Sequence, residues 1–182
     1  MLILASGSPR RKELLKKLTN EFVVISPDID ESLLNIPAKD LPIEESRAKA
    51  YAIASQYPND EVLACDTVVI LDGKVLGKPH TEERAIEMLK MESGKRQIVL
   101  SGYTYIGKGV EISRSVATYV YFKALDEQTI VDYVKEKRPL DKAGAYGIQD
   151  EYGLIERIEG SYDNVMGLPV EDIDAHCPIR QR

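Results

Sequence analysis

The N-terminal stretch Ser6-Gly-Ser-Pro-Arg-Arg11 has the residue types of an anion-binding turn. It follows the apolar segment 1–5, which is typical of the start of a buried strand. Ser8 is a good helix N-cap and Pro9 suits the first helical position, so a helix is expected to begin here. Free backbone N–H groups at a helix start favour an anion, and the two guanidinium groups match phosphate oxygens. The stretch therefore predicts a phosphate site, although a plain helix cap with solvated arginines is the better interpretation when it is taken alone.

A lone carboxylate stands inside an otherwise apolar strand. The segment that ends at Leu71 begins at Glu61 and is apolar apart from Asp66 and Thr67, which is typical of a central strand buried on both faces. A carboxylate there is costly unless it is paired, hydrogen-bonded or bound to a metal. Asp66 could cap a neighbouring element, but nothing nearby in the sequence needs a cap. A functional role for Asp66 is therefore the favoured interpretation.

Other segments carry residues that could bind a charged ligand. Asp28-Ile-Asp-Glu31 is best interpreted alone as a solvated turn, and its carboxylates could also bind a divalent metal. Lys78 falls on a loop between a hairpin and a helix, where ligand-facing residues are common. The loop from Pro139 to Gln149 contains two glycines, which permit a close approach of the backbone to a ligand. Lys49 would be a surface lysine if nothing else were known of it.

These residues need a framework of strands and helices to position them. Apolar patterning predicts strands over 21–26, 61–71, 97–106, 110–124 and 153–159, and helices over 42–57, 82–91 and 126–137. Thr81 and Asp126 are expected to cap helices, and Asp72-Gly73 is a hairpin signal. In the helix over 42–57, the expected buried face consists of Ile43, Ala50, Ala54 and Tyr57. Interleaved helices, strands and hairpins predict a mixed α/β (α+β) protein with a mixed twisted sheet flanked by helices.

Composition limits the classes of protein that this chain can belong to. Its 182 residues, 43% hydrophobic and 30% charged, are expected to form a single domain over 1–182. The net charge of −6 disfavours a nucleic-acid partner, so an anionic small ligand would need a local basic pocket. The densest basic cluster consists of Arg10, Arg11, Lys12, Lys16 and Lys17.

The cysteines and apolar runs bear on the compartment. Cys65 and Cys177 lie far apart without metal-ligand spacing, which is typical of reduced thiols in a cytoplasmic protein. The apolar start of the chain is too short for the core of a signal peptide. No apolar run approaches the roughly 20 residues that a membrane span needs, so no membrane partner is expected.

Five short blocks of the sequence follow one another along the chain. They are Ser6-Gly-Ser-Pro-Arg-Arg11, Asp30-Glu31, the helix with Lys49-Ala50, Asp66-Thr67 with Gly77-Lys-Pro79, and Asp141 to Gln149 followed by Gly160-Ser-Tyr and Gly167-Leu-Pro169. In number and order they resemble the Maf family of nucleotide pyrophosphatases across nearly the whole chain. The loop that ends at Gln149 looks like that of the branch acting on dTTP and UTP, whereas the branch acting on 7-methyl-GTP carries a different loop. The chain departs from the family at Cys177-Pro178, which interrupts a last helix that is usually longer.

The resemblance implies a fold, a reaction and roles for particular residues. The implied fold is inosine-triphosphatase-like, with two lobes around a cleft, and the implied reaction hydrolyses dTTP or UTP to the monophosphate and pyrophosphate. Asp66 would accept the proton of the attacking water, and Glu31 with Asp66 would hold Mg²⁺ or Mn²⁺. The remaining implied roles are the grip on the phosphates by Ser8, Arg11, Lys49 and Lys78, and the choice of substrate by Arg10, Thr67 and Gln149.

Two alternatives stay open at this point. A nucleotide-binding regulator of septum formation would bind without turnover, and a restraint on cell division could also coexist with catalysis. A house-cleaning hydrolase would act on a modified or non-standard nucleotide. The nucleoside triphosphate is the expected partner, and a homodimer stays open because the last helix is short.

Overall fold

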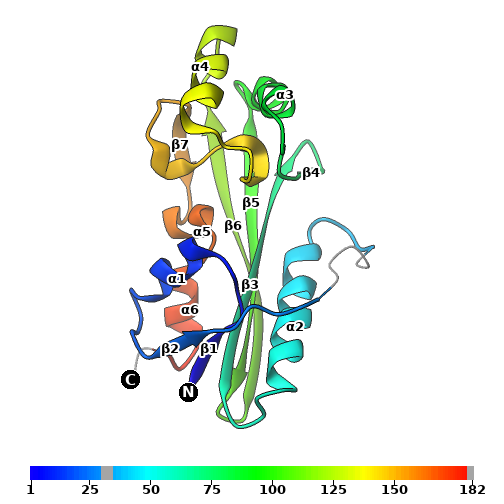
Figure 1. Ribbon diagram of the computed structural model, residues 1–182, viewed down its shortest axis with the longest axis vertical. Helices are drawn as coiled ribbons and strands as arrows, with labels where there is room; N and C mark the ends of the chain where they lie inside the picture. Colours follow the sequence, from blue (N-terminus) through cyan, green and yellow to red (C-terminus); the bar gives the residue numbers. More distant parts are fainter. Residues whose placement is uncertain (30–34, 180–182) are drawn as a thin grey trace. The chain divides into compact units, whose positions relative to one another are not determined.

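The computed structural model of the protein describes residues 1–29 and 35–179 (Figure 1). Helices interleave with strands along the chain, as the sequence predicts. The elements are β1 (Leu2–Leu4), α1 (Pro9–Leu15), β2 (Phe22–Val24), α2 (Leu41–Ala54), β3 (Glu61–Leu71), β4 (Lys74–Leu76), α3 (Glu82–Glu92), β5 (Arg96–Gly107), β6 (Val110–Phe122), α4 (Glu127–Lys137), the 3₁₀ turns η2 (Ala143–Ala145) and η3 (Ile148–Asp150), β7 (Ile155–Glu159), α5 (Tyr162–Met166) and α6 (Val170–His176).

The described strands form one mixed sheet of seven strands. Its order is β2-β1-β3-β5-β6-β7, and β4 pairs with β3 outside this path. β1 runs parallel to both β2 and β3, whereas the β3–β4 and β6–β7 pairs are antiparallel. The predicted class, a mixed α/β protein with a mixed sheet flanked by helices, is confirmed.

The chain clusters into two compact units. Unit 1 contains residues 1–67, 100–116 and the segment that begins at 163, and unit 2 contains residues 68–99 and 117–162. The long strands β3, β5 and β6 contribute residues to both units. The expectation of a single domain over 1–182 stays a prediction.

The core of unit 1 has two layers because β1 alternates its side chains between the two faces of the sheet. Leu2 and Leu4 pack with the apolar residues of α1 and α6, and Ile3 and Ala5 pack with α2 (Figure 1). All four side chains are at most 1% exposed. A short strand buried on both faces has to be continuously apolar, and the opening of the sequence has this composition.

Local sequence signals determine the predicted helix starts and the first hairpin. The side chains of Ser8, Thr81 and Asp126 accept hydrogen bonds from the backbone N–H groups three residues later, at 3.3, 3.2 and 2.7 Å. Asp72 and Gly73 both have positive φ, at 51° and 78°, as a tight hairpin turn of this type requires. These caps and this turn are confirmed.

One expectation about α2 is wrong. The helix ends at Ala54 with Ser55 as its C-cap, so the chain leaves the helix before Tyr57. Tyr57 is consequently 37% exposed and does not belong to the buried face, whereas Ala50 is fully buried. Pro58 follows Tyr57 directly, and a proline disfavours helical backbone at the residue before it.

The short C-terminal segment is anchored in unit 1. Ile173 of α6 is fully buried, and the Asp172 carboxylate accepts hydrogen bonds from Tyr103 Oη at 2.7 Å and from Arg114 Nε at 2.8 Å. Partial burial raises the pKa of Asp172, but hydrogen bonds from Arg114 and Tyr103 outweigh this effect and hold it below its usual value. The helix ends at His176, before Cys177-Pro178, as expected.

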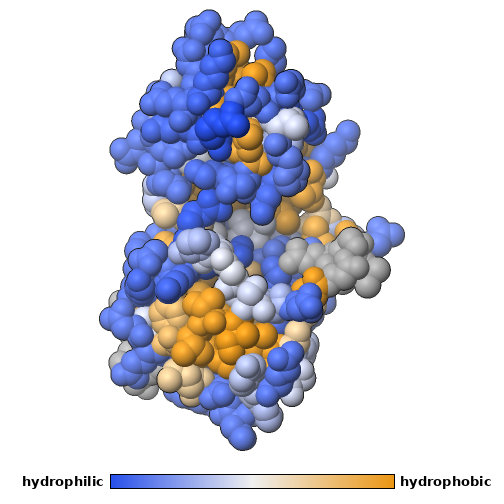
Figure 2. Space-filling model, viewed as in Figure 1, coloured by the Kyte–Doolittle hydropathy of each residue, from blue (hydrophilic) through white to orange (hydrophobic). Residues whose placement is uncertain are grey.

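Apolar side chains gather on the face of unit 1 that Figure 2 shows, around β2. This strand is at the edge of the sheet, and its Val23 and Val24 are 42% and 40% exposed. In the described part of the chain, no helix combines the length and the apolar character that crossing a membrane would demand.

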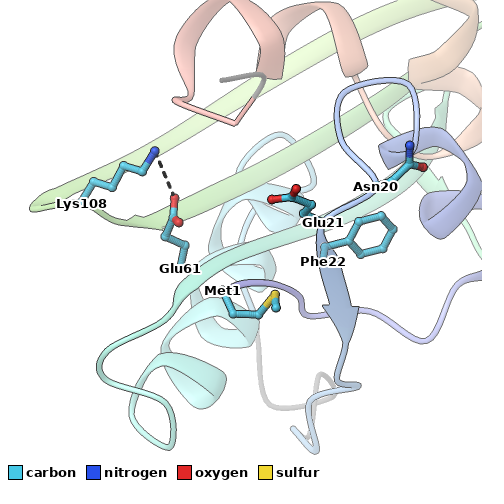
Figure 3. A pocket seen from close by; sticks show the side chains of 6 residues that line it. All are labelled: Met1, Asn20, Glu21, Phe22, Glu61 and Lys108. Carbon is cyan, nitrogen blue, oxygen red and sulfur yellow. Dashed lines mark ion pairs between the residues drawn. The ribbon is translucent and has the colours of Figure 1, made fainter. Parts of the chain in front are cut away.

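An open hollow lies where β1 and β3 begin (Figure 3). It is lined by Met1, Asn20, Glu21, Phe22, Glu61 and Lys108. Lys108 Nζ lies 3.9 Å from Glu61 Oε1. Because β1 and β3 are parallel, the candidate residues after Leu4 and at Asp66 lie toward the opposite end of these strands.

Candidate functional site

The turn after β1 orients the first cationic side chain. The backbone N–H of Ser8 donates to Ser6 Oγ at 3.1 Å. Ser8 Oγ accepts from the Arg11 N–H and so caps α1, which begins at Pro9. Leu14 and Leu15 anchor this seven-residue helix in the core. The predicted strand, turn and helix are therefore confirmed, and Ser8 still has a hydroxyl hydrogen to donate.

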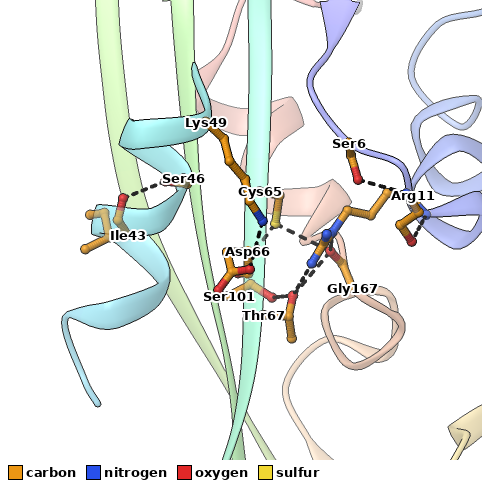
Figure 4. A network of polar contacts seen from close by, with 11 residues as sticks. Ser6, Arg11, Ile43, Ser46, Lys49, Cys65, Asp66, Thr67, Ser101 and Gly167 are labelled. Atoms are coloured by element: carbon orange, nitrogen blue, oxygen red, sulfur yellow. Dashed lines mark hydrogen bonds and ion pairs between the residues drawn. The ribbon is translucent and has the colours of Figure 1, made fainter. Parts of the chain in front are cut away.

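The Arg11 guanidinium is held in one orientation by two bonds (Figure 4). Its Nε donates to the carbonyl oxygen of Gly167 at 2.7 Å, and its Nη2 donates to Thr67 Oγ1 at 3.1 Å. Both acceptors are neutral, and no carboxylate pairs with Arg11 among the described residues. The positive charge is therefore fixed in place without a protein counter-charge, which suits an anionic ligand.

Neighbouring residues orient Thr67 and the Gly167 carbonyl in turn. Thr67 Oγ1 lies 2.8 Å from Ser101 Oγ, and Ser101 is fully buried in β5. Gly167 has a φ of 120°, which favours glycine. The sequence singled out neither Ser101 nor the Gly167 carbonyl for this contact. The Gly167-Leu-Pro169 block was the signal that could have indicated it.

β3 presents its adjacent residues Asp66 and Thr67 to opposite sides of the sheet. Val62 and Ala64 pack on the α2 side, whereas Leu63 and Cys65 pack on the side of α1 and α6. Alternation along a strand therefore sends Asp66 toward α2 and Thr67 toward α1. The carboxylate and the arginine site are in this way built from adjacent residues of one strand.

Asp66 and Lys49 form a partly buried ion pair. Lys49 Nζ lies 3.1 Å from Asp66 Oδ1, and the two side chains are 13% and 12% exposed (Figure 4). Lys49 reaches β3 from α2, which packs on this face through Ala50 and Ile53. A surface lysine, the interpretation favoured by the helix pattern alone, would not be positioned in this way. An ion pair compensates for the cost of burying the carboxylate.

Cys65 lies beside Asp66 but is not a nucleophile candidate. Burial raises the pKa of the Cys65 thiol, an effect that the nearby Arg11 charge only partly opposes. Its Sγ lies 3.4 Å from the Gly167 carbonyl oxygen. The thiol therefore packs in the core beneath the cluster and stays protonated at neutral pH.

Unit 2 carries two further candidates on adjoining segments. Lys78 is exposed just after β4, and Gln149 is exposed on η3. The backbone N–H of Gly144 donates to the Gly77 carbonyl oxygen at 3.2 Å, which joins the two loops. Lys78 and Gln149 thus belong to one local arrangement of unit 2, whereas Arg11, Lys49, Asp66 and Thr67 belong to unit 1.

The remaining candidates bear on metal binding and substrate choice. Glu31, the second predicted metal ligand, lies outside the described residues, and Arg10 is exposed on the first turn of α1. Asp66 offers a hard carboxylate oxygen, which suits Mg²⁺ or Mn²⁺. In residues 1–29 and 35–179, no group of three or more His, Cys, Asp or Glu side chains could hold a metal. Of the two predicted ligands only Asp66 is described, and the site with Glu31 stays a proposal.

A buried acid, a lysine and an arginine fixed by neutral partners are residue types that a phosphate-ester or anhydride hydrolase uses. The Maf-like protein family model matches residues 1–176, and the chain therefore belongs to the Maf family.

Curated relatives cover nearly the whole chain. A dTTP/UTP pyrophosphatase from Thermococcus gammatolerans is 44% identical over 174 residues, which are 95% of this chain and 93% of that protein. Another from Bacteroides thetaiotaomicron is 44% identical over 177 residues, covering 94% of this chain and 92% of that protein. A solved structure of the Staphylococcus aureus Ham1 protein matches 69% of this chain and 72% of its own, with a TM-score of 0.47 and 20% identity.

Proposed function

We propose that this protein hydrolyses dTTP and UTP to the nucleoside monophosphate and pyrophosphate. Relatives at 41–44% identity carry the name dTTP/UTP pyrophosphatase, which supports this substrate class. The observation that carries the proposal is the fixed Arg11 guanidinium, whose described partners are neutral. One of these partners, Thr67, directly follows the buried Asp66 on β3. A cation held in this way can bind a phosphate, and a nearby carboxylate can activate water.

The proposed reaction is an attack of water on the α-phosphorus. The bond between that phosphorus and the oxygen bridging to the β-phosphate breaks, so pyrophosphate leaves with the bridging oxygen. Asp66 accepts the proton of the water. Ser8, Arg11 and Lys49 hold phosphoryl oxygens, and Lys78 is proposed to do the same. Because negative charge spreads over these oxygens, fixed cations supply most of the catalysis.

A divalent cation is proposed to assist. When bound, Mg²⁺ or Mn²⁺ neutralises phosphate charge and favours ionisation of the attacking water. Asp66 and Glu31 are its proposed ligands. We expect EDTA to abolish pyrophosphate release and excess Mg²⁺ or Mn²⁺ to restore it. Adding the same volume of buffer without a divalent metal should not restore it. Full turnover in chelator would show that the hydrolysis needs no exchangeable metal.

The choice of pyrimidine is proposed to depend on Gln149. Uracil and thymine present a C=O, N–H, C=O edge, and a glutamine amide can accept from the N–H and donate to one carbonyl. Cytosine lacks that N–H and carries an amino group instead, so one polar group would stay unpaired. Leaving such a group unpaired is how a polar site rejects a near-isostere. Thr67 and Arg10 are proposed to support nucleotide choice from unit 1.

A nucleotide panel tests this function directly. We expect pyrophosphate release from dTTP and UTP to exceed that from CTP, ATP and GTP. Gln149→Ala should reduce the UTP-to-CTP ratio of kcat/KM by about tenfold while changing kcat for UTP less, since an unpaired polar group costs about 1–3 kcal/mol. Gln128→Ala is the matched control, because Gln128 is an exposed glutamine of α4 bonded to Asp132.

Two outcomes of the panel would reject the proposal. Equal turnover of all five nucleotides would remove the pyrimidine preference. Nucleotide binding without pyrophosphate release would favour the alternative of a nucleotide-binding regulator of septum formation.

A further inference from the structure

Unit 2 contains a buried carboxyl group that the proposed reaction does not use. Glu92, the last residue of α3, is fully buried, and its Oε1 accepts a hydrogen bond from Gln97 Nε2 at 3.1 Å. Its Oε2 has no partner among the described residues. Burial raises the pKa of Glu92 well above its usual value, and the Gln97 bond opposes this only in part. Such a costly group is expected to have a local purpose.

The carboxyl group lies directly against the loop that leads to Gln149. Gly144 in this loop has a φ of 73°, and a methyl group added to it would lie only 2.8 Å from Glu92 Oε1. The loop backbone therefore approaches the carboxyl group as closely as a residue without a side chain allows. The loop therefore rests against the Glu92 carboxyl group at Gly144.

The same glycine joins this loop to the segment that carries Lys78. Gly144 N–H donates to the Gly77 carbonyl oxygen at 3.2 Å, and His80 N–H donates to the Leu140 carbonyl oxygen at 2.9 Å. These two bonds flank Lys78 on both sides. A shift of the loop at Gly144 would consequently move the segment with Lys78 as well as the segment with Gln149.

A second support holds only the Gln149 end of the loop. Tyr133 of α4 is fully buried, donates its hydroxyl to Asp150 Oδ2 at 2.7 Å and accepts from the Gly147 N–H at 3.0 Å. Neither bond involves residues 77–80. Tyr133 and Glu92 can therefore be distinguished by which of the two candidate residues each would affect.

We propose that Glu92 is a positioning residue that holds Lys78 and Gln149 in their working places through Gly144. Glu92 does not touch the nucleotide in this scheme, and its effect passes through the two bonded loops. The consequence for catalysis rests on the proposed function, in which Lys78 holds phosphate and Gln149 selects the pyrimidine. The local consequence for the two loops does not depend on that function.

The test compares Glu92→Ala, Glu92→Gln and Tyr133→Phe, with Glu87→Ala as control. Glu87 is an exposed glutamate of the same helix, paired with Arg84. Hydrogen exchange of the Gly144 and His80 amides and kinetics with UTP and CTP are measured below the melting temperature of every variant. Glu92→Ala should accelerate exchange at both amides, lower kcat/KM for UTP about tenfold and reduce the UTP-to-CTP ratio, since a displacement of about 1 Å can cost 10²-fold.

The other variants separate positioning from general stability. Glu92→Gln keeps the shape and an oxygen that can accept the hydrogen bond from Gln97, so it should stay within about threefold of the wild type. Tyr133→Phe should reduce the UTP-to-CTP ratio by loosening the Gln149 end but leave the His80 amide protected. Unchanged exchange in Glu92→Ala, or faster exchange with unaltered UTP kinetics, would overturn the positioning role. A wild type that releases no pyrophosphate would instead overturn the proposed function, while exchange would still decide the link between the loops.

Discussion

Asp66→Asn is expected to reduce kcat for dTTP and UTP by about 10²-fold or more, which corresponds to about 2.7 kcal/mol of transition-state stabilisation. The amide keeps the shape of the carboxylate but cannot accept the proton of the attacking water. It can still accept a hydrogen bond from Lys49, whose Nζ lies 3.1 Å from Asp66 Oδ1. The fold should therefore persist, and fixed-time assays of pyrophosphate release measure the loss of kcat.

Asp72→Asn provides the matched control for this prediction. Asp72 is also an ion-paired aspartate, 2.8 Å from Lys95 Nζ, but its side chain is 67% exposed in the hairpin turn. The Asp72→Asn protein should keep wild-type activity and lose no more than about a few tenths of a kcal/mol of stability. Near wild-type turnover by a folded Asp66→Asn protein would show that another group accepts the proton.

Much of the fold could be predicted because its signals are local. A serine before a proline, a threonine or aspartate before a helical pattern, and Asp72-Gly73 each act within four residues. The structure bears out these caps and this turn. The end of α2 could not be predicted as well, because helical periodicity continues to Tyr57 although the helix ends at Ala54.

The site could be predicted in part. Asp66 was identifiable because a carboxylate inside an apolar strand needs a partner, and the strand pattern alone shows that. Its partner was not identifiable from the helix pattern, since Lys49 resembles a surface lysine until α2 packs on β3. The bond from Arg11 to Gly167 joins residues 156 apart, and no local rule specifies such a contact.

Glu92 illustrates what periodicity does not show. It is the last residue of a helix that also carries exposed glutamates, and no pattern in the sequence singles it out. Its burial follows from the loop around Gly144, more than 50 positions later, and from Gln97 on the next strand. Tertiary packing determines the environment of such a residue, and only the structure places its carboxyl group against the loop around Gly144.

The second large effect is expected at Arg11. Arg11→Ala should lower kcat/KM for dTTP and UTP by about 10- to 100-fold, since a hydrogen bond to a charged group contributes about 1.5–3 kcal/mol. The loss should appear for every nucleotide to a similar degree, because phosphate oxygens are common to all of them. Steady-state kinetics across the nucleotide panel measure this, and thermal melting should show only a modest shift.

Arg11→Lys is the most informative companion, because it keeps the charge and removes the planar fork. A lysine cannot donate to the Gly167 carbonyl and to Thr67 from the fixed positions that Arg11 Nε and Nη2 occupy, so its charge should be poorly placed. We expect at most partial recovery relative to Arg11→Ala. Arg84→Ala, at a half-exposed arginine of α3 paired with Glu87, should behave as the wild type. If Arg11→Ala lowers the melting temperature sharply while activity per folded molecule stays intact, Arg11 only fastens Gly167 to α1 and does not bind phosphate.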